Sequence, residues 1–370
     1  MKTDIHTEDN GRRHKRELLV DGEHASRLWV VDHKVRLAGT RVSMGGIAGV
    51  RTEPEHRKKG YMRRLMSDTV AYMTERGYAV SMLFGIPDFY NKFGYLPALP
   101  EHHATIATRD AERACSDRSP GVRSLTDEDY PFVIETSSAA GRERPASLVR
   151  TAETFRGFRR GSGWDVDTRA FIVEDGSGKP VAYFVLDDRS HVVRVTELGA
   201  PKRTAFPALL CRFAQLAIER RCGEIEVHLP PDNPFVEYMQ RFGCVSRLTR
   251  RRMGGGMMRI LNQHPLFEAL RPGLERRLQR GPLAGRPVTL RIDTDLGVTE
   301  LGLNHEATGE PVAAAIRPGQ NVLTQLLVGY RTAADVLADP DTDWEGEAHA
   351  VTSALFDGRP CPYVWYADRF

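Results

Sequence analysis

With 370 residues, the chain is long enough for two or three domains. Its 41% hydrophobic and 27% charged residues are typical of a globular protein, and a net charge of only +3 argues against a nucleic-acid-binding protein. No apolar run is long enough to span a membrane, and residues 1–17 lack the apolar core of a secretory signal. We therefore expect neither a nucleic-acid partner nor a membrane.

The cysteines are scattered and form no CxxC pair. Their odd number and their spacing predict neither a zinc site nor a disulfide framework, and they fit a reducing, cytoplasmic setting. The histidines also lack the spacing of metal ligands, so no metal site is predicted. The five cysteines are Cys115, Cys211, Cys222, Cys244 and Cys361.

Strand and helix patterns alternate in the first part of the chain. Residues 11–17, GRRHKRE, are interpreted as part of a solvated tail. Residues 17–50 contain apolar runs on either side of an Asp-Gly turn, which predicts β-hairpins. Apolar residues recur at helical spacing over 57–76, residues 78–85 predict a buried strand, and residues 86–95 predict a short helix.

The second part of the chain repeats this order weakly. Within residues 181–244, strands are followed by a helix pattern, another strand and a segment that again ends in Phe-Gly. This order predicts a duplication. Three glycines at 254–256 then mark either a hinge or a loop packed closely against backbone, and a strand-rich unit follows. The predicted domains are residues 1–120, 121–258 and 259–370.

The stretch VRTEPEHRKKGYMRRLM, residues 50–66, joins a strand end, a basic loop and a helix start. Such a loop presents unpaired backbone N–H groups, and the helix dipole favours an anion there. Gly60 lets the backbone approach a ligand, and the neighbouring cations suit phosphate oxygens. The alternative is a solvated helix face, although cations at a helix N-terminus are unfavourable by roughly 0.3–1 kcal/mol each. The cations are Arg57, Lys58, Lys59, Arg63 and Arg64.

The same stretch resembles the pyrophosphate motif of the GCN5-related N-acetyltransferases (GNAT), and FYNKFGY, residues 89–95, resembles their later tyrosine segment. The order of the chain is similar to that of the Eis (enhanced intracellular survival) subfamily. This resemblance implies an α+β or α/β fold, with two tandem GNAT-like mixed-sheet domains before an α+β domain like sterol carrier protein. Two departures are Met62, in place of a small residue, and a shortened N-terminus before the first hairpin.

The resemblance implies that acetyl-CoA is the acyl donor, with no metal. Tyr90 is implied as general acid and the C-terminal carboxylate of Phe370 as base. The tail is aromatic to its end, which predicts that it is docked. The implied donor-binding residues are Val50, Arg51, Thr52, Arg57, Lys58, Lys59, Gly60, Tyr61, Met62 and Arg63.

The second copy lacks these features. Alignment of the two halves places Pro207, which has no N–H to donate, opposite Gly60, and it places Met239 opposite Tyr90. Thr204 stands opposite Arg57. The second domain is therefore predicted to be structural and to help frame the acceptor pocket.

The leading hypothesis is an N-acetyltransferase that acts on a primary amine, either of a small molecule or of lysine. The resemblance further implies a homo-oligomer, a hexamer. A second hypothesis is a non-catalytic carrier that binds a lipid or small molecule in the C-terminal domain, and a third is a regulator that acetylates protein lysines. The sequence does not choose between acceptors.

Overall fold

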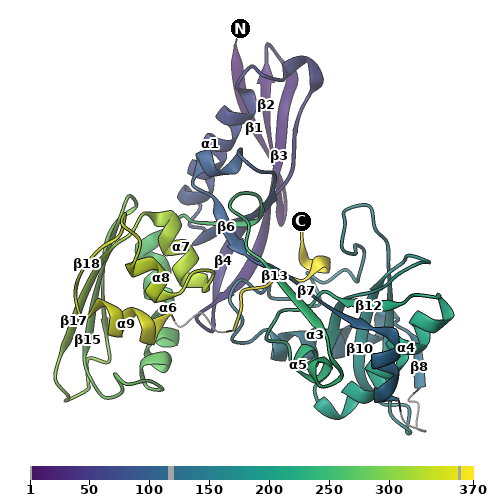
Figure 1. Ribbon diagram of the computed structural model, residues 1–370. Coiled ribbons are helices and arrows are strands. Elements are labelled where there is room, and N and C mark those ends of the chain that lie inside the picture. Colours follow the sequence, from purple (N-terminus) through teal and green to yellow (C-terminus); the bar gives the residue numbers. More distant parts are fainter. Residues whose placement is uncertain (1, 116–120, 357–359) are drawn as a thin grey trace.

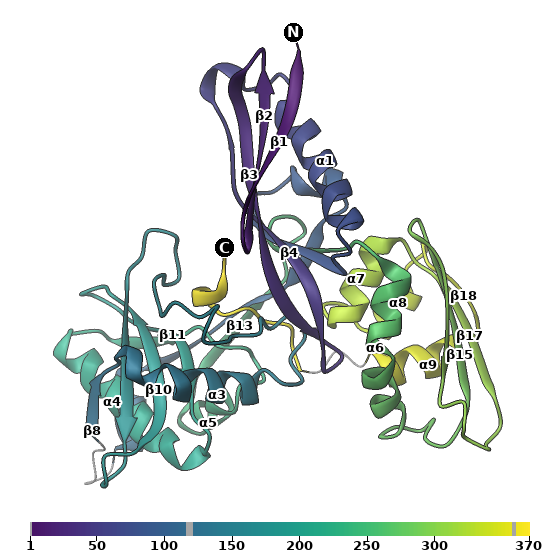
Figure 2. The same cartoon turned by 180° about the vertical axis from the view of Figure 1, so that it is seen from behind.

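The computed structural model describes residues 2–115, 121–356 and 360–370. The end of the first predicted domain, 116–120, thus lies outside the described residues. The ribbon forms three lobes in chain order, and both views place the C-terminus where the first two lobes meet (Figures 1 and 2). The tail therefore lies far from the rest of the third lobe.

The first lobe is built on a seven-stranded mixed sheet, in the order β1-β2-β3-β4-β5-β14-β6. All neighbours in it are antiparallel except β4 and β5, which are parallel and joined through the helix α1. The strands are β1 (Thr3–Asn10), β2 (Arg13–Val20), β3 (Glu23–Leu37), β4 (Thr40–Thr52), β5 (Val80–Gly85), β14 (Gly255–Ile260) and β6 (Leu96–Leu99).

The segment predicted to be a solvated tail is instead part of this sheet. Residues 11–17 form the turn between β1 and β2 and the first half of β2. The buried positions of β2 include His14 and Arg16, and Arg16 forms an ion pair with Asp68 of α1. Charged side chains at inward positions hid the strand from a hydrophobic pattern. The described chain thus enters the sheet directly through β1.

The second lobe repeats the arrangement with a second seven-stranded sheet, in the order β13-β7-β12-β11-β10-β9-β8. Its one parallel pair, β11 with β12, is likewise joined through a helix, α4. The two sheets thus confirm the predicted tandem fold. The strands are β13 (Val245–Thr249), β7 (Glu101–Ala107), β12 (Glu224–Val227), β11 (Val193–Gly199), β10 (Pro180–Asp187), β9 (Thr168–Glu174) and β8 (Gly121–Ser124).

The two sheets exchange strands. β7 leaves the first lobe and pairs between β13 and β12, whereas β14 returns from the second lobe and pairs between β5 and β6. Gly254, on the return path, has a positive φ of 77°, and a Cβ there would lie 3.0 Å from the backbone nitrogen of Pro87. The glycine run is therefore a close backbone contact. The sheets cut across the predicted ranges 1–120 and 121–258.

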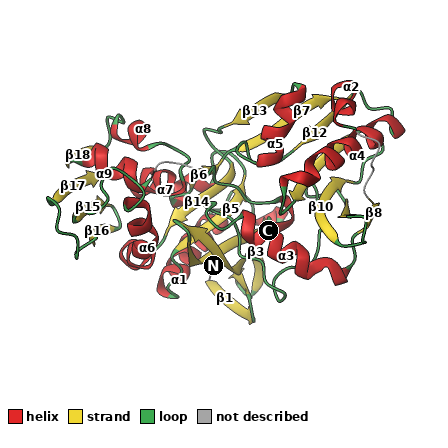
Figure 3. Ribbon diagram, turned by 90° about the horizontal axis from the view of Figure 1, so that it is seen from below, coloured by secondary structure: helices red, strands yellow, loops and turns green. Residues whose placement is uncertain are grey.

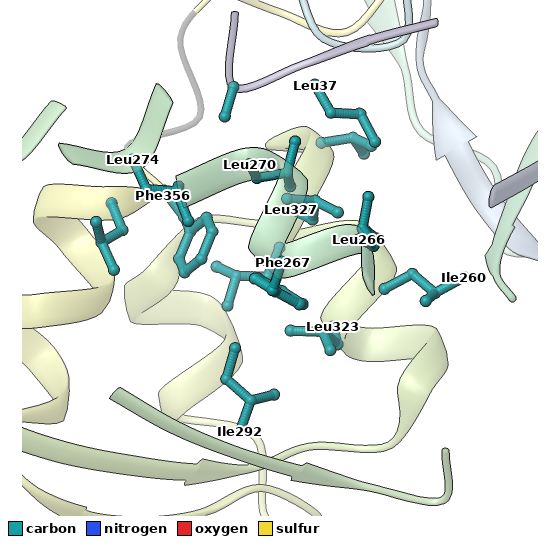
Figure 4. Close-up of a cluster of buried hydrophobic side chains, with 14 of the residues drawn as sticks. Leu37, Ile260, Leu266, Phe267, Leu270, Leu274, Ile292, Leu323, Leu327 and Phe356 are labelled. Atoms are coloured by element: carbon teal, nitrogen blue, oxygen red, sulfur yellow. The ribbon is translucent and has the colours of Figure 1, made fainter. Parts of the chain in front are cut away.

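The third lobe has a four-stranded sheet, β16-β15-β17-β18, whose helices face the first lobe. Leu37 and Ile260 of the first sheet share one apolar cluster with Phe267 and Leu327 of these helices (Figure 4). The strands are β15 (Val288–Thr294), β16 (Gly297–Leu303), β17 (Val312–Arg317) and β18 (Asp343–Gly346).

The helices cover these sheets (Figure 3). None of the helices in the described parts of the chain is long and apolar enough to cross a membrane. They are α1 (Tyr61–Glu75), α2 (Thr108–Ala111), α3 (Tyr130–Ala140), α4 (Phe206–Glu219), α5 (Pro234–Met239), α6 (Gln263–Leu278), α7 (Gln320–Val328), α8 (Ala333–Leu337) and α9 (Ala348–Leu355).

One disulfide was not predicted. Cys115 and Cys211 are bonded, with Cα atoms 4.8 Å apart. Cys115 follows β7 and α2, and Cys211 lies on α4, so 96 residues separate them in sequence. The prediction was wrong because it depended on local spacing, whereas the strand exchange brings these two thiols together.

Candidate active site

The parallel strands β4 and β5 separate part-way along their length. Their pairing ends at Ile47 and Leu83, after which β4 continues with β3 alone and β5 continues with β14. A cleft between diverging strands exposes backbone N–H and C=O groups that a ligand can use. The residues that follow the split on β4 include the predicted donor-binding residues Val50, Arg51 and Thr52.

A bulge in β4 lies at this split. Gly49 and Val50 stand opposite the single residue Leu28 of β3, and Gly49 has a positive φ of 56°. A bulge turns a backbone N–H away from the ladder. The predicted donor residues Val50, Arg51 and Thr52 lie at and directly after this bulge.

The predicted anion loop lies between β4 and α1. Gly60 is the residue before α1 and has a left-handed φ of 81°, which favours glycine. The first turn of α1 carries no acidic residue. Four exposed cations surround it and make no ion pair with a described residue, which leaves them available for an anion: Arg57, Lys58, Lys59 and Arg63.

Arg57 and Met62 have different surroundings in the predicted anion loop. Arg57 donates from Nε to the carbonyl oxygen of Thr52 at 3.3 Å, so it also fixes the loop to the end of β4. Met62 is buried in the core between α1 and the sheet, beside Leu65. At this position only the backbone can face a ligand, which explains how a large residue replaces the small one of the family motif. The half-buried ring of Tyr61 lies 5.8 Å from that of His56, at an angle of 59° to it.

Tyr90 lies on a short 3₁₀ helix, Tyr90–Phe93, beside the end of β5. Its ring fills the space over Gly85, where a Cβ would lie 2.4 Å from it. The ring is buried, yet among the described residues its hydroxyl has no hydrogen-bond partner. Burial raises the pKa of Tyr90, so the phenol keeps its proton at neutral pH. It is thus a phenol with a free proton to donate.

The C-terminal tail is held by the second lobe. Tyr363 and Trp365 belong to that lobe's apolar core. The hydroxyl of Tyr363 donates to the carbonyl of His228 at 2.8 Å, and Asp368 accepts from Nε of Arg150 at 2.8 Å. The tail is therefore an anchored segment, as its aromatic density predicted.

The Arg150 anchor is a buried ion-pair network. Arg150 also binds Glu197 of β11 through both terminal nitrogens, and Tyr183 donates to the same carboxylate at 2.8 Å. Burial opposes the charge on Arg150, but the carboxylates of Asp368 and Glu197 outweigh it and raise its pKa. A charged, buried arginine that holds two carboxylates therefore fixes the tail two residues before its end.

Phe370 reaches back to the first lobe. Its ring stacks on His33 of β3 with centroids 4.9 Å apart, and it meets Phe84 of β5 edge-on at 5.8 Å. It also covers Gly46 of β4, where a Cβ would lie 2.5 Å from the ring. Burial lowers the pKa of His33 to about 4, so this imidazole is neutral at pH 7.

Phe370 and Tyr90 approach β5 from opposite faces. Residues alternate along a strand, so Leu83 and Gly85 face α1 and Tyr90, whereas Phe84 faces the tail. The strands β4 and β5 are no longer hydrogen-bonded to each other beyond Ile47 and Leu83. The structure therefore brings the donor loop, Tyr90 and the C-terminus to the two sides of one split.

The second lobe also has a parallel strand pair joined through a helix, but its side chains differ. Pro207 lies in the first turn of α4, Thr204 lies in the short 3₁₀ helix before it, and Met239 at the end of α5 is fully buried. Two anchoring residues of the tail, Tyr363 and Trp365, pack into this lobe's core. Relative to the helix starts, Ala205 is the counterpart of Gly60, and Pro207 lies two residues further along, inside α4.

Several residues around the site were missed by sequence reasoning. They are Gly46, His33, Asp368, Arg150 and Trp164, which come from strands, loops and the tail. The pair Gly45-Gly46 in the middle of a strand was the one visible signal, because interior glycines mark close approach. The others depend on contacts across hundreds of residues.

Comparisons with known proteins fit this geometry. Residues 12–98 match the family model of the acetyltransferase (GNAT) domain. No curated protein matches the chain. The first lobe therefore carries a GNAT domain in residues 12–98.

Similar solved structures extend the likeness to the whole chain. A probable N-acyltransferase from Enterococcus faecalis V583 is 18% identical with a TM-score of 0.72, covering 97% of this chain and 90% of that one. A GCN5-related N-acetyltransferase from Anabaena variabilis is 18% identical with a TM-score of 0.70, covering 96% and 89%. Eis1 from Mycobacterium abscessus is 16% identical with a TM-score of 0.68, covering 100% of both chains. The chain shares their fold.

Proposed function

We propose that the protein is an N-acetyltransferase that transfers the acetyl group of acetyl-CoA to a primary amine. One observation carries the proposal: the C-terminal residue is held against the β4–β5 split of a GNAT domain, on the face opposite Tyr90. A donor can enter from the α1 side and an amine from the tail side, so that the two substrates meet at the split.

The donor would be bound by the chain from Val50 to Arg63. The backbone N–H groups at the start of α1, Gly60 and the exposed cations suit a pyrophosphate. The bulge at Val50 supplies a backbone donor to the carbonyl oxygen as negative charge develops there. Both contributions use backbone groups that the fold holds in place.

In the proposed reaction the amine nitrogen attacks the thioester carbonyl, the C–N bond forms and the C–S bond breaks. Tyr90 gives its proton to the departing thiolate, and its raised pKa keeps that proton available. The nitrogen loses a proton to solvent as the amide forms, and the tyrosinate takes one back from solvent. The ammonium must first lose a proton. The Phe370 carboxylate is proposed to take part as base, directly or through water, and its main contribution is position.

Further proposals follow from the likeness to Eis-type proteins. The second lobe would frame the acceptor site, the third lobe would be a domain like sterol carrier protein, and the chain would assemble into a homo-oligomer, a hexamer. The acceptor is proposed to be a small-molecule amine or a lysine. The carrier hypothesis is less well supported, because an unpaired Tyr90 hydroxyl and an anion loop have no purpose in an inert domain.

The test is acetyl-CoA binding by calorimetry, followed by release of CoA thiol with a panel of amines. We expect saturable binding and amine-dependent thiol release. Binding without release by any amine would favour the carrier, and no binding would remove the proposed function.

A further inference from the structure

A cavity of about 240 Å³ adjoins the site on the tail side. The end of β5 contributes Phe84, Gly85 and Ile86, and the tail contributes Tyr363 and Arg369. The Tyr90 ring packs against Gly85, and Arg369 directly precedes Phe370 in the chain. Tyr90 and Phe370 are not among the described residues of the lining, but each lies next to one of them.

The walls of this cavity are partly polar, but they include several apolar and aromatic side chains. Trp164, from a loop of the second lobe, is 56% exposed, and Ile86 is 66% exposed. Both are large side chains that gain from covering by a ligand. An apolar body of about one ring fits, since a cavity of about 150 Å³ already holds benzene.

The charges of the lining do not suit a polycation. Glu101 is the one carboxylate in the described lining, and Arg251 already holds it through hydrogen bonds of 3.1 and 2.8 Å. A second ammonium group would have to compete with this ion pair. It would also meet the positive charge of Arg369 in a partly dry space.

Arg369 is a cation without a counter-ion. Its guanidinium carbon lies 3.9 Å from the centre of the Tyr366 ring and 4.9 Å from that of Phe84. It forms no ion pair with a described residue, and its Nε is buried without a hydrogen-bond partner. A half-buried guanidinium with one buried and unpaired N–H favours a carboxylate, which it can bind through two hydrogen bonds.

We infer that the acceptor is a monoamine on a single aromatic or similarly flat apolar body that also carries a carboxylate. Trp164 and Phe84 contact the body, and Arg369 binds the carboxylate. The inference rests on the proposed acetyl transfer, because it treats the cavity as the acceptor site of that reaction.

The first experiment compares amines in the thiol-release assay. We expect kcat/KM to be highest for 4-(aminomethyl)benzoate, lower for 4-methylbenzylamine and lowest for spermidine. Arg369→Gln should lower the ratio of kcat/KM between the first two amines about tenfold or more, the worth of a charged hydrogen bond. Arg369→Lys should retain most of the ratio. Arg252→Gln, which removes an exposed guanidinium outside the cavity, should leave the ratio unchanged. Spermidine as best acceptor, or an unchanged ratio in Arg369→Gln, would overturn the inference.

The second experiment measures binding without turnover. 4-Methylbenzoate, which has no amine, should quench tryptophan fluorescence saturably, and Arg369→Gln should raise its Kd at least tenfold. Trp164→Ala should remove most of the quench, whereas Trp344→Ala on the third sheet should not. No saturable binding would overturn the inference even in an active enzyme. Binding in a protein that acetylates no amine would instead count against the proposed function alone.

Discussion

The contact between Gly46 and the last residue offers a direct test of the tail's role. A methyl group at Gly46 would lie 2.5 to 2.9 Å from three atoms of the Phe370 ring. Gly46 does not have a positive φ, so its backbone conformation accepts alanine. Gly46→Ala therefore forces either the strand or the ring to move, and the ring at the chain end moves more easily.

The size of the effect can be worked from the contacts that the ring loses. Full burial of a phenylalanine side chain is worth about 1.5–3 kcal/mol, and an aromatic pair adds about 0.5–1.5 kcal/mol. Phe370 is only partly buried, so we take the free energy lost when its ring undocks as about 2 kcal/mol. This would reduce the docked population of the last residue about 30-fold. We expect kcat to fall by about 10- to 100-fold, with little change in the melting temperature.

The assay is steady-state thiol release, with acetyl-CoA affinity measured separately by calorimetry. Gly176→Ala is the matched control, because a Cβ there meets nothing within 4 Å. In a chain lacking Phe370, Gly46→Ala should cause no further loss of kcat, because both changes remove the same contact between Gly46 and the Phe370 ring. Parent-like turnover in Gly46→Ala would refute the reasoning. A loss of acetyl-CoA affinity would show that Gly46→Ala acts on donor binding and not on the position of Phe370.

Three further outcomes follow from the site and its surroundings. Tyr90→Phe should lower kcat roughly 10²–10⁴-fold in thiol release with the fold intact, while Met239→Leu changes it little; equal loss in both would remove the acid role. Gly60→Ala and Gly285→Ala should each lower the free energy of unfolding by about 1–2 kcal/mol, because both glycines have a positive φ and open space around them. Only Gly60→Ala should also weaken acetyl-CoA binding in calorimetry. The pKa of His33 is about 4 in the folded chain against about 6.5 unfolded, so the unfolded state takes up the proton first as pH falls. Stability should thus be lost between about pH 6.5 and 4, by up to about 1.4 kcal/mol per pH unit, and His33→Gln should reduce that slope in urea unfolding.

The sequence predicted the local parts of the fold and missed the connections between them. Helical spacing and the loop at Gly60 identified α1, and the echo in the second half identified a second sheet of the same kind. No local pattern indicates which sheet a strand joins, so the exchange of β7 and β14 was not foreseeable. The same exchange brings Cys115 to Cys211, a pair that spacing alone had argued against.

The candidate site divides in the same way. The donor loop is one continuous segment, so its residue types and helix start could be read directly. Tyr90 was found through a motif, but its unpaired hydroxyl needed coordinates. The proposed acceptor side could not be predicted, because Trp164 and Arg369 meet in one cavity, and Phe370 covers Gly46, only through the path of the tail, which Arg150 holds. Buried ion pairs of that kind leave no periodic trace in a sequence.

The most direct measurement of the central claim is a product balance with isotopically labelled acetyl-CoA. The protein, labelled acetyl-CoA and 4-(aminomethyl)benzoate are incubated together, and CoA thiol and N-acetylated amine are quantified by mass spectrometry. The account predicts equal amounts of both products in the parent and a loss of both in Tyr90→Phe. Thiol release without acetylated amine, or full product formation in Tyr90→Phe, would contradict it.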